Sequence, residues 1–284
     1  MSERILTQTH LTAFEEYLLK EEKSAATVEK YLRDARAFLI YAEGKEITKE
    51  LTVAWKKSLE DNGYKPRSIN SMLASLNCLL EFMGAKDCKV KNLRIQKQVY
   101  LAEEKELTKD EYKRLLAAAK KKEQLNLVIR TICATGIRVS ELKYFTVEAI
   151  QNGEVSVKCK SKTRTIIVPG DLRKLLLSYA KRKGITEGVI FITRNGKPLD
   201  RSYIWSQMKG LCEAAGVNPS KVFPHNLRKL FARTFYGIEK DIAKLADILG
   251  HSSIETTRIY IMSTSSEHRR QIERMGLTFA GSYA

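Results

Sequence analysis

The sequence predicts a mainly helical protein with a small β-sheet, divided into an all-helical N-terminal domain and an α+β C-terminal domain. From residue 9 to 83, apolar residues recur at the three- and four-residue spacing of amphipathic helices. The apolar alternation typical of strands is concentrated in 155–168. Between these regions, 86–106 is dense in charge and has no stable period. We therefore predict an N-terminal domain over 1–85, an interdomain linker over 86–106 and a C-terminal domain over 107–284.

The N-terminal domain is expected to contain four helices. The second has Ser24 or Thr27 as its N-cap and Gly44 as its C-terminal stop. Thr48 opens the third helix, and the fourth begins near Pro66, since proline is favoured at the first helical position. The apolar stripes of the first two helices are Leu11, Phe14, Leu18 and Leu19, then Val28, Tyr31, Leu32, Ala35, Phe38 and Leu39.

The C-terminal domain is expected to mix helices with short strands. Two strands within 155–168 are joined by a tight basic turn over Lys160–Arg164, which by itself is more typical of a solvated loop than of a binding site. On the helix that Asp200 caps, Trp205 and Met208 are expected in the core. The other expected elements are helices at 107–116, 125–133, 137–142, 171–183 and 200–216, helices from His225, from Asp241 to Leu249 and from Ser253, and a strand at 189–192.

The charge of the chain points to a polyanionic partner. Lys and Arg number 50 against 33 Asp and Glu, and the excess is spread along the chain, which favours DNA or RNA over a membrane surface. The five cysteines form no Cys-x-x-Cys pair, so neither a disulfide framework nor a zinc site is indicated. With no secretory signal or membrane-spanning run, we expect a cytoplasmic protein with no membrane partner.

Several cations and one tyrosine suit chemistry on a phosphate. Arg228 borders the apolar stripe of its helix, so its charge is partly desolvated and needs an anion. His225 lies one turn earlier, although a capping role explains a single His-x-x-Arg better than a catalytic one. Arg138 begins a short helix where an anion can bind, but pairing with Glu141 one turn later is an equal alternative. Position alone does not select Tyr260 among 12 tyrosines.

Taken together, these motifs resemble the tyrosine recombinases, or phage integrase family. The resemblance runs from about Glu106 to Arg274, and the region from Lys23 to Met83 resembles the family's helical core-binding domain. The motifs that carry it, in chain order, are Ala134-Thr-Gly-Ile-Arg-Val-Ser-Glu-Leu142, the basic hairpin, His225-x-x-Arg228, Leu249-Gly-His251 and Ser253-Ile-Glu-Thr-Thr-Arg-Ile-Tyr260. Five ordered motifs are far more specific than any one of them.

The resemblance implies a catalytic set. Tyr260 would attack a DNA phosphodiester to give a 3′-phosphotyrosyl link and a free 5′-hydroxyl. Arg138 and Arg228 would bind the nonbridging oxygens, because planar forked donors match the charge that accumulates there. His225 would assist proton transfer from Tyr260, and His251 would donate a hydrogen bond to the phosphate.

Two further residues complete this set. Glu141 would support the site without giving a proton to substrate. A hairpin lysine would protonate the leaving 5′-oxygen, and we assign it to Lys160. The chain lacks the glycine of the common Lys-Gly-x-Lys-x-Arg pattern, so Lys162 and Lys158 stay open as alternatives.

The resemblance also implies the partners and the outcome. The substrate would be double-stranded DNA with short inverted-repeat core sites, bound by a homotetramer that is a monomer or weak oligomer without DNA. The reaction would need no metal or nucleotide cofactor and would produce integration, excision, inversion or resolution, as on mobile genetic elements. A type IB topoisomerase-like enzyme and a non-catalytic DNA-binding accessory protein are the alternatives.

Overall fold

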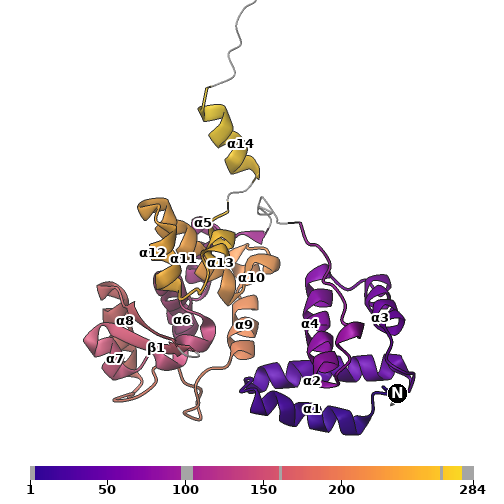
Figure 1. The fold of residues 1–284 in the computed structure, drawn as a ribbon. Coiled ribbons are helices and arrows are strands. Elements are labelled where there is room, and N and C mark those ends of the chain that lie inside the picture. The colour runs from indigo at the N-terminus through magenta and orange to yellow at the C-terminus, as the bar shows by residue number, and fades with distance from the viewer. Residues whose placement is uncertain (1–3, 97–104, 160–161, 263–264, 277–284) are drawn as a thin grey trace, which may run out of the picture. The chain divides into compact units, whose positions relative to one another are not determined.

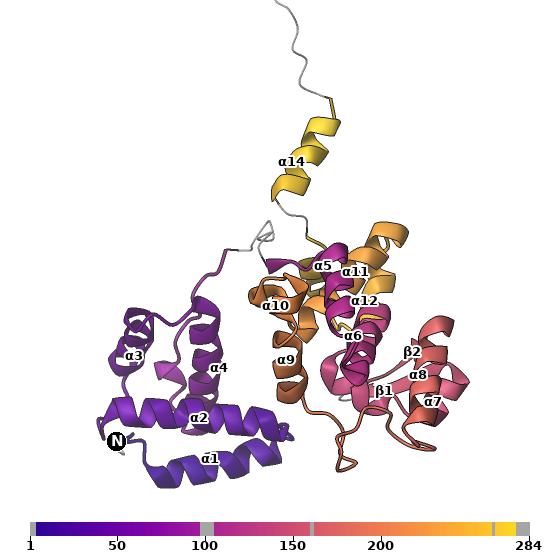
Figure 2. The same ribbon diagram turned by 180° about the vertical axis from the view of Figure 1, so that it is seen from behind.

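The computed structural model describes residues 4–96, 105–159, 162–262 and 265–276, and it divides the chain into two units, Met1–Lys97 and Gln98–Ala284. The helices and strands of the two units are drawn in Figures 1 and 2. Each unit has its own hydrophobic core. Helices dominate both, and the one sheet described has two strands, which confirms the predicted fold class. Among the described residues, no helix combines the length and the apolar character that a membrane span requires.

Four helices and a short 3-10 turn build the N-terminal unit. Thr48 caps the third helix through the amide of Leu51, and Pro66 occupies the first position of the fourth, as predicted. Phe38 and Trp55 meet edge to face in the core, with ring centroids 5.2 Å apart. The elements are α1 (Gln8–Lys20), α2 (Ala25–Ala42), α3 (Lys49–Asp61), α4 (Pro66–Phe82) and η1 (Lys86–Cys88).

The segment that follows α4 packs on this unit, although the sequence pattern predicts a linker there. Cys88 and Val90 are buried in the core. The Asn77 side chain on α4 both donates to and accepts from the backbone of Val90, at 2.9 Å in each direction, and Asn70 does the same for Leu93. The two side-chain amides bind the backbone of Val90 and Leu93 as a neighbouring strand would in a sheet. These residues are therefore held without being in a helix or strand, and no sequence period predicts their burial.

The C-terminal unit combines a two-stranded hairpin with helices (Figure 2). Strands β1 (Glu154–Cys159) and β2 (Lys162–Ile167) are antiparallel, with Val157 opposite Arg164. The remaining elements, in chain order, are α5 (Lys109–Ala118), α6 (Glu123–Thr135), η3 (Val139–Tyr144), α7 (Val147–Asn152), α8 (Gly170–Arg182), α9 (Arg201–Lys209), α10 (Cys212–Ala215), η4 (Pro219–Lys221), α11 (Pro224–Glu239), α12 (Ile242–Leu249), α13 (Ile254–Ile261) and α14 (Ser265–Arg274).

Three expectations for this unit need correction. The strands extend further than the alternation indicates, so Thr163 and Arg164 lie in β2 and not in the turn. The run 189–192 forms isolated bridges from Val189 to Thr146 and from Ile192 to Pro198, and no strand, because each end meets a different partner. The helix expected over 200–216 is two, α9 and α10, separated at Gly210.

Candidate active site

Arg138 and Glu141 form a closed pair at the start of η3. Helix α6 ends at Gly136, whose φ of +65° and close approach to Phe231 of α11 exclude a side chain, since a Cβ would lie 2.3 Å from that ring. The turn then presents Arg138. Buried Glu141 accepts from the Arg138 amide at 2.7 Å and from Arg138 Nη1 at 3.1 Å. This is the pairing that the sequence left open as an alternative to anion binding.

Arg228 is the most deeply buried cation of the site. Arg228 is 1% exposed, so it is more fully buried than the helical pattern of the sequence predicts. Nη1 donates to the carbonyl of Gly136, and Nη2 donates to the carbonyl of Leu249 at 2.6 Å. Burial first, and then the charge of Arg138, lower the pKa of Arg228 to about 10. Its Nε is buried with no hydrogen-bond partner among the described residues, which leaves a donor for an anion.

His251 follows the C-terminus of α12, as predicted. Gly250 takes the left-handed conformation there, with φ of +64°. Nε2 of His251 lies 3.0 Å from Arg228 Nη2, and Nδ1 lies 2.9 Å from the Thr257 hydroxyl on α13. Because arginine only donates, Nε2 accepts and the imidazole proton lies on Nδ1, which donates to Thr257. Burial first, and then the charge of Arg228, lower the pKa of His251 to about 4.

Tyr260 lies between the two histidines. Its ring centroid is 5.1 Å from that of His225 and 4.9 Å from that of His251, and the residue is 7% exposed. Tyr260 belongs to a small apolar cluster with Leu245 and Leu249 of α12. His225 follows Pro224 in the first turn of α11, and it is not the N-cap, which is Phe223. Desolvation of its ring, followed by the Lys229 and Arg228 charges, lowers the pKa of His225.

A third arginine, Arg164 of β2, belongs to this constellation, and the sequence analysis assigned it no role. Nη2 donates to Glu141 at 2.7 Å, and Nη1 donates to the carbonyl of Leu249. A signal for it existed, because the alternation that buries Ile166 and Val168 also turns Arg164 inward. Thr257, which contacts His251, was likewise missed.

The hairpin lysines are placed only in part. Lys160 lies outside the described residues, and nothing is described of the Lys162 side chain. Lys158 is exposed on β1, and its carbonyl accepts from the Tyr144 hydroxyl at 3.2 Å. The register of the proton donor therefore stays a prediction.

A hollow of about 320 Å³ opens beside these residues. Arg138, His225 and Arg228 line it together with Arg201 and Trp205 of α9. Trp205 was expected in the core, but it is 49% exposed, so that expectation is wrong. Met208 of the same helix is buried, as expected. The pattern alone could not separate them, because an aromatic residue at helical spacing suits either place.

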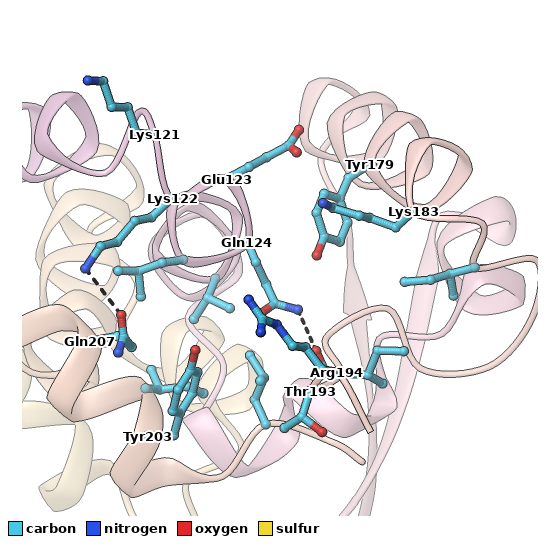
Figure 3. A pocket seen from close by; sticks show the side chains of 16 residues that line it. Lys121, Lys122, Glu123, Gln124, Tyr179, Lys183, Thr193, Arg194, Tyr203 and Gln207 are labelled. Carbon is cyan, nitrogen blue, oxygen red and sulfur yellow. Dashed lines mark hydrogen bonds between the residues drawn. The ribbon is translucent and has the colours of Figure 1, made fainter. Parts of the chain in front are cut away.

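The opposite side of α9 faces a second, larger hollow of about 910 Å³ (Figure 3). Tyr203 and Gln207 line it, and Lys122 Nζ donates to Gln207 Oε1 at 3.3 Å. Gln124 Nε2 donates to the carbonyl of Ile192 at 2.8 Å across its floor. This hollow has a basic rim, but it contains none of the residues grouped around Tyr260.

The structure thus brings six of the seven predicted site residues together, namely Arg138, Glu141, His225, Arg228, His251 and Tyr260. With Arg164, three guanidinium groups face one carboxylate, which leaves an excess of positive charge. The lowered pKa values of both histidines favour neutral imidazoles near pH 7. Such a site is suited to an anion whose charge increases during reaction.

Two family comparisons match the chain. Residues 105–267 match the family described as Phage integrase family, and residues 11–86 match Phage integrase, N-terminal SAM-like domain. The tyrosine recombinase XerA of Pyrococcus furiosus is 30% identical over 98% of this chain and 97% of its own length. The tyrosine recombinase XerD of Vibrio cholerae is 26% identical over 71% of this chain and 72% of its own length.

Solved structures are also similar. A crystal structure of XerA recombinase covers 96% of this chain and 100% of its own, with 27% identity and a TM-score of 0.53. A lambda integrase tetramer bound to a Holliday junction covers 91% of this chain and 78% of its own, with 20% identity and a TM-score of 0.73. At that identity, the likeness to lambda integrase supports the fold alone.

Proposed function

The chain belongs to the phage integrase family and is a site-specific DNA recombinase, and we propose that it cleaves and rejoins DNA strands through the hydroxyl of Tyr260. One observation carries this assignment: Tyr260 lies between His225 and His251, beside a buried Arg228 whose Nε has no partner among the described residues. A nucleophile, a base and a cation are thereby within reach of one phosphate.

In the proposed reaction, Tyr260 Oη attacks phosphorus and the bond from phosphorus to the 5′-oxygen breaks. The neutral His225 accepts the phenol proton, since its lowered pKa keeps the ring unprotonated near pH 7. A hairpin lysine, Lys160 in our assignment, gives a proton to the leaving 5′-oxygen. The products are a 3′-phosphotyrosyl link and a free 5′-hydroxyl, and attack by the 5′-hydroxyl of a partner strand reverses the step.

Arg138 and Arg228 stabilise the transition state in this proposal. A phosphodiester carries one negative charge, and a second develops on the nonbridging oxygens as Tyr260 attacks. His251 would donate to the same oxygens through Nε2, which requires a proton on that nitrogen. The Thr257 hydroxyl can donate to Nδ1 as well as accept from it, and the phosphate charge favours the protonated ring, so either form is accessible.

We propose double-stranded DNA with short inverted-repeat core sites as the substrate, and a homotetramer on paired sites that is a monomer or weak oligomer before DNA binds. Lambda integrase, whose fold this chain shares, is a tetramer in its structure on a Holliday junction, and the proposed assembly is based on that arrangement. In this scheme the predicted 1–85 domain grips the core site, and the predicted 107–284 domain with its tail helix performs the reaction. A cytoplasmic location fits a DNA substrate and the free thiols of the four cysteines whose side chains the structure describes.

The other two functions are not favoured. The named relatives and structures are recombinases and integrases, and neither a topoisomerase nor an accessory protein is among them. A non-catalytic binder would also have no need to hold Tyr260 between two imidazoles.

A nicked suicide duplex built on inverted repeats beside the gene tests the nucleophile. We expect the wild type to form a covalent protein–DNA complex and Tyr260→Phe to form none while still shifting the duplex in a gel. Tyr236→Phe, in the same apolar cluster, is the matched control and should react normally. A covalent complex that survives Tyr260→Phe would reject Tyr260 as the nucleophile.

The same duplex tests the proton donor. We expect Lys160→Ala to slow cleavage at least about 100-fold with little change in binding, because general acid catalysis typically contributes that much. Lys162→Ala and Lys158→Ala should slow it far less. If either of these variants gives the large loss instead, the proton donor is that residue.

A further inference from the structure

Arg164 lies where the hairpin, η3 and the end of α12 meet. Its side chain is 13% exposed. Nη2 donates to Glu141 Oε2 at 2.7 Å, and Nη1 donates to the carbonyl of Leu249, the residue at which α12 ends. One guanidinium thus joins η3 to the end of α12, and Arg164 itself is 85 residues from Leu249 in sequence.

Glu141 accepts two hydrogen bonds from guanidinium groups, and Arg164 donates one of them. Oε1 accepts from Arg138 Nη1, whereas Oε2 accepts from the Arg138 amide and from Arg164 Nη2. Since Glu141 is buried, loss of Arg164 leaves its carboxylate short of a positive partner. The carboxylate would then attract Arg138 more strongly, away from the hollow where a phosphate binds.

Arg164 also covers the turn that leads to His251. A Cβ built on Gly250 would lie 2.4 Å from Arg164 Nη1 and 2.8 Å from its Cδ, so the arginine packs directly over that glycine. The Leu249 carbonyl accepts from Arg164 and from Arg228, and the Gly250 carbonyl accepts from Arg138 Nη2 at 3.3 Å. Three arginines therefore converge on the negative end of the α12 dipole.

We propose that Arg164 is a positioning residue for strand cleavage: by binding Glu141 and the end of α12, it holds Arg138 and His251 in the arrangement that meets the phosphate. Its own fork is directed at Glu141 and Leu249, so it does not contact the reacting atoms and moves no proton. This inference rests on the proposed function.

Single-turnover formation of the covalent complex on the suicide duplex tests the inference. We expect Arg164→Gln to lower the maximal rate about 10- to 100-fold, since small misplacements of catalytic groups cost that much. The DNA concentration for half-saturation should change less than about twofold, because binding energy comes from many other phosphate contacts. Arg164→Lys keeps the charge but cannot reach both acceptors with a fork, so its rate should be intermediate.

A double-mutant cycle identifies the route of the effect. If Arg164 acts through Glu141, the rate of Arg164→Gln/Glu141→Gln should lie close to that of Glu141→Gln alone. A duplex with a methyl group in place of one nonbridging oxygen supplies a second readout, because less charge then develops for Arg138 to stabilise. The deficit of Arg164→Gln relative to the wild type should shrink on that duplex.

Arg182→Gln is the matched control, as this exposed arginine of α8 pairs with Glu123 outside the site, and it should react normally. The inference is overturned by a wild-type rate for Arg164→Gln or by an undiminished deficit on the methylated duplex, and losses that multiply in the cycle overturn the route through Glu141. If Arg164→Gln does not fold, Arg164→Lys decides, and a rate within about twofold of the wild type overturns the inference. In each case, an active wild type and an inactive Tyr260→Phe show that the proposed function holds, so failure of the Arg164 inference can be told apart from failure of that function.

Discussion

His251 is an imidazole that the fold keeps neutral. Burial, followed by the charges of Arg228, Arg138 and Arg164, lowers its pKa to about 4 from an ordinary value of 6.5. The unfolded chain therefore binds more protons at this position than the folded chain between those two pH values. Stability must fall as the pH decreases through that window, because folding then has to expel a proton.

This linkage predicts a pH-dependent loss of stability that His251→Gln reduces. Between pH 7 and pH 4.5, the wild type should lose more free energy of unfolding than the variant, by about 1 kcal/mol after allowance for the partial exposure of the ring. Chemical denaturation at both pH values measures the difference. His10→Gln, which removes an imidazole from the N-terminal unit, is the control. Equal pH dependence in wild type and His251→Gln would show that the ring is not held neutral.

Individual site residues could be predicted from the sequence only where a motif names them. Tyr260, His225 and Arg228 were identified because their spacing matches family motifs, and the structure brings them together. Arg164 lay within the quoted hairpin motif, but no local pattern shows that it reaches Glu141 and an α12 carbonyl. Such a role depends on contacts between distant segments, and helical or strand periodicity contains no information about these contacts.

At the scale of elements, α4 does more than fill the core of the N-terminal unit. Asn77 and Asn70 project from it and bind the backbone of Val90 and Leu93. The chain from Lys89 to Leu93 is thereby fixed without forming a helix or strand. Periodicity predicted the four helices well, but it could not predict this packing, because an asparagine on a helix carries no sequence signal for a hydrogen-bond partner in the following segment.

Asn77→Ala should therefore destabilise the N-terminal unit by about 1–2 kcal/mol, since it removes two hydrogen bonds from a partly buried backbone segment. Chemical denaturation of the full chain provides the measurement. Asn62→Ala, at an exposed position after α3, serves as the control and should have a much smaller effect. A loss no greater than that of the control would mean that the segment contributes nothing to stability.

At the scale of the whole molecule, net charge determines how the protein first associates with DNA. The formal net charge is +17 at pH 7. Since Lys and Arg are spread along the chain, contacts to many phosphates are expected to supply most of the affinity, and base contacts the choice of site.

Affinity should therefore fall steeply with salt. Between 50 and 200 mM NaCl, we expect the dissociation constant for a duplex of about 30 base pairs to rise at least 100-fold, as for proteins that neutralise several phosphates. Fluorescence anisotropy with the Tyr260→Phe variant measures binding without cleavage. A duplex of unrelated sequence should show a similar slope at lower affinity. A change of less than about threefold would indicate that few ionic contacts form.

The hydrogen bond between Arg228 and His251 has a consequence for which DNA sequences the protein cleaves. Arg228 Nε is left as a donor for a phosphate, but Nη2 lies 3.0 Å from His251 Nε2, so a phosphate that is to accept from Nη2 or from His251 Nε2 must first break that internal contact. A transient encounter on random chromosome sequence lacks the supporting contacts to compensate for that loss. Cleavage at unrelated DNA sequences is therefore expected to be disfavoured.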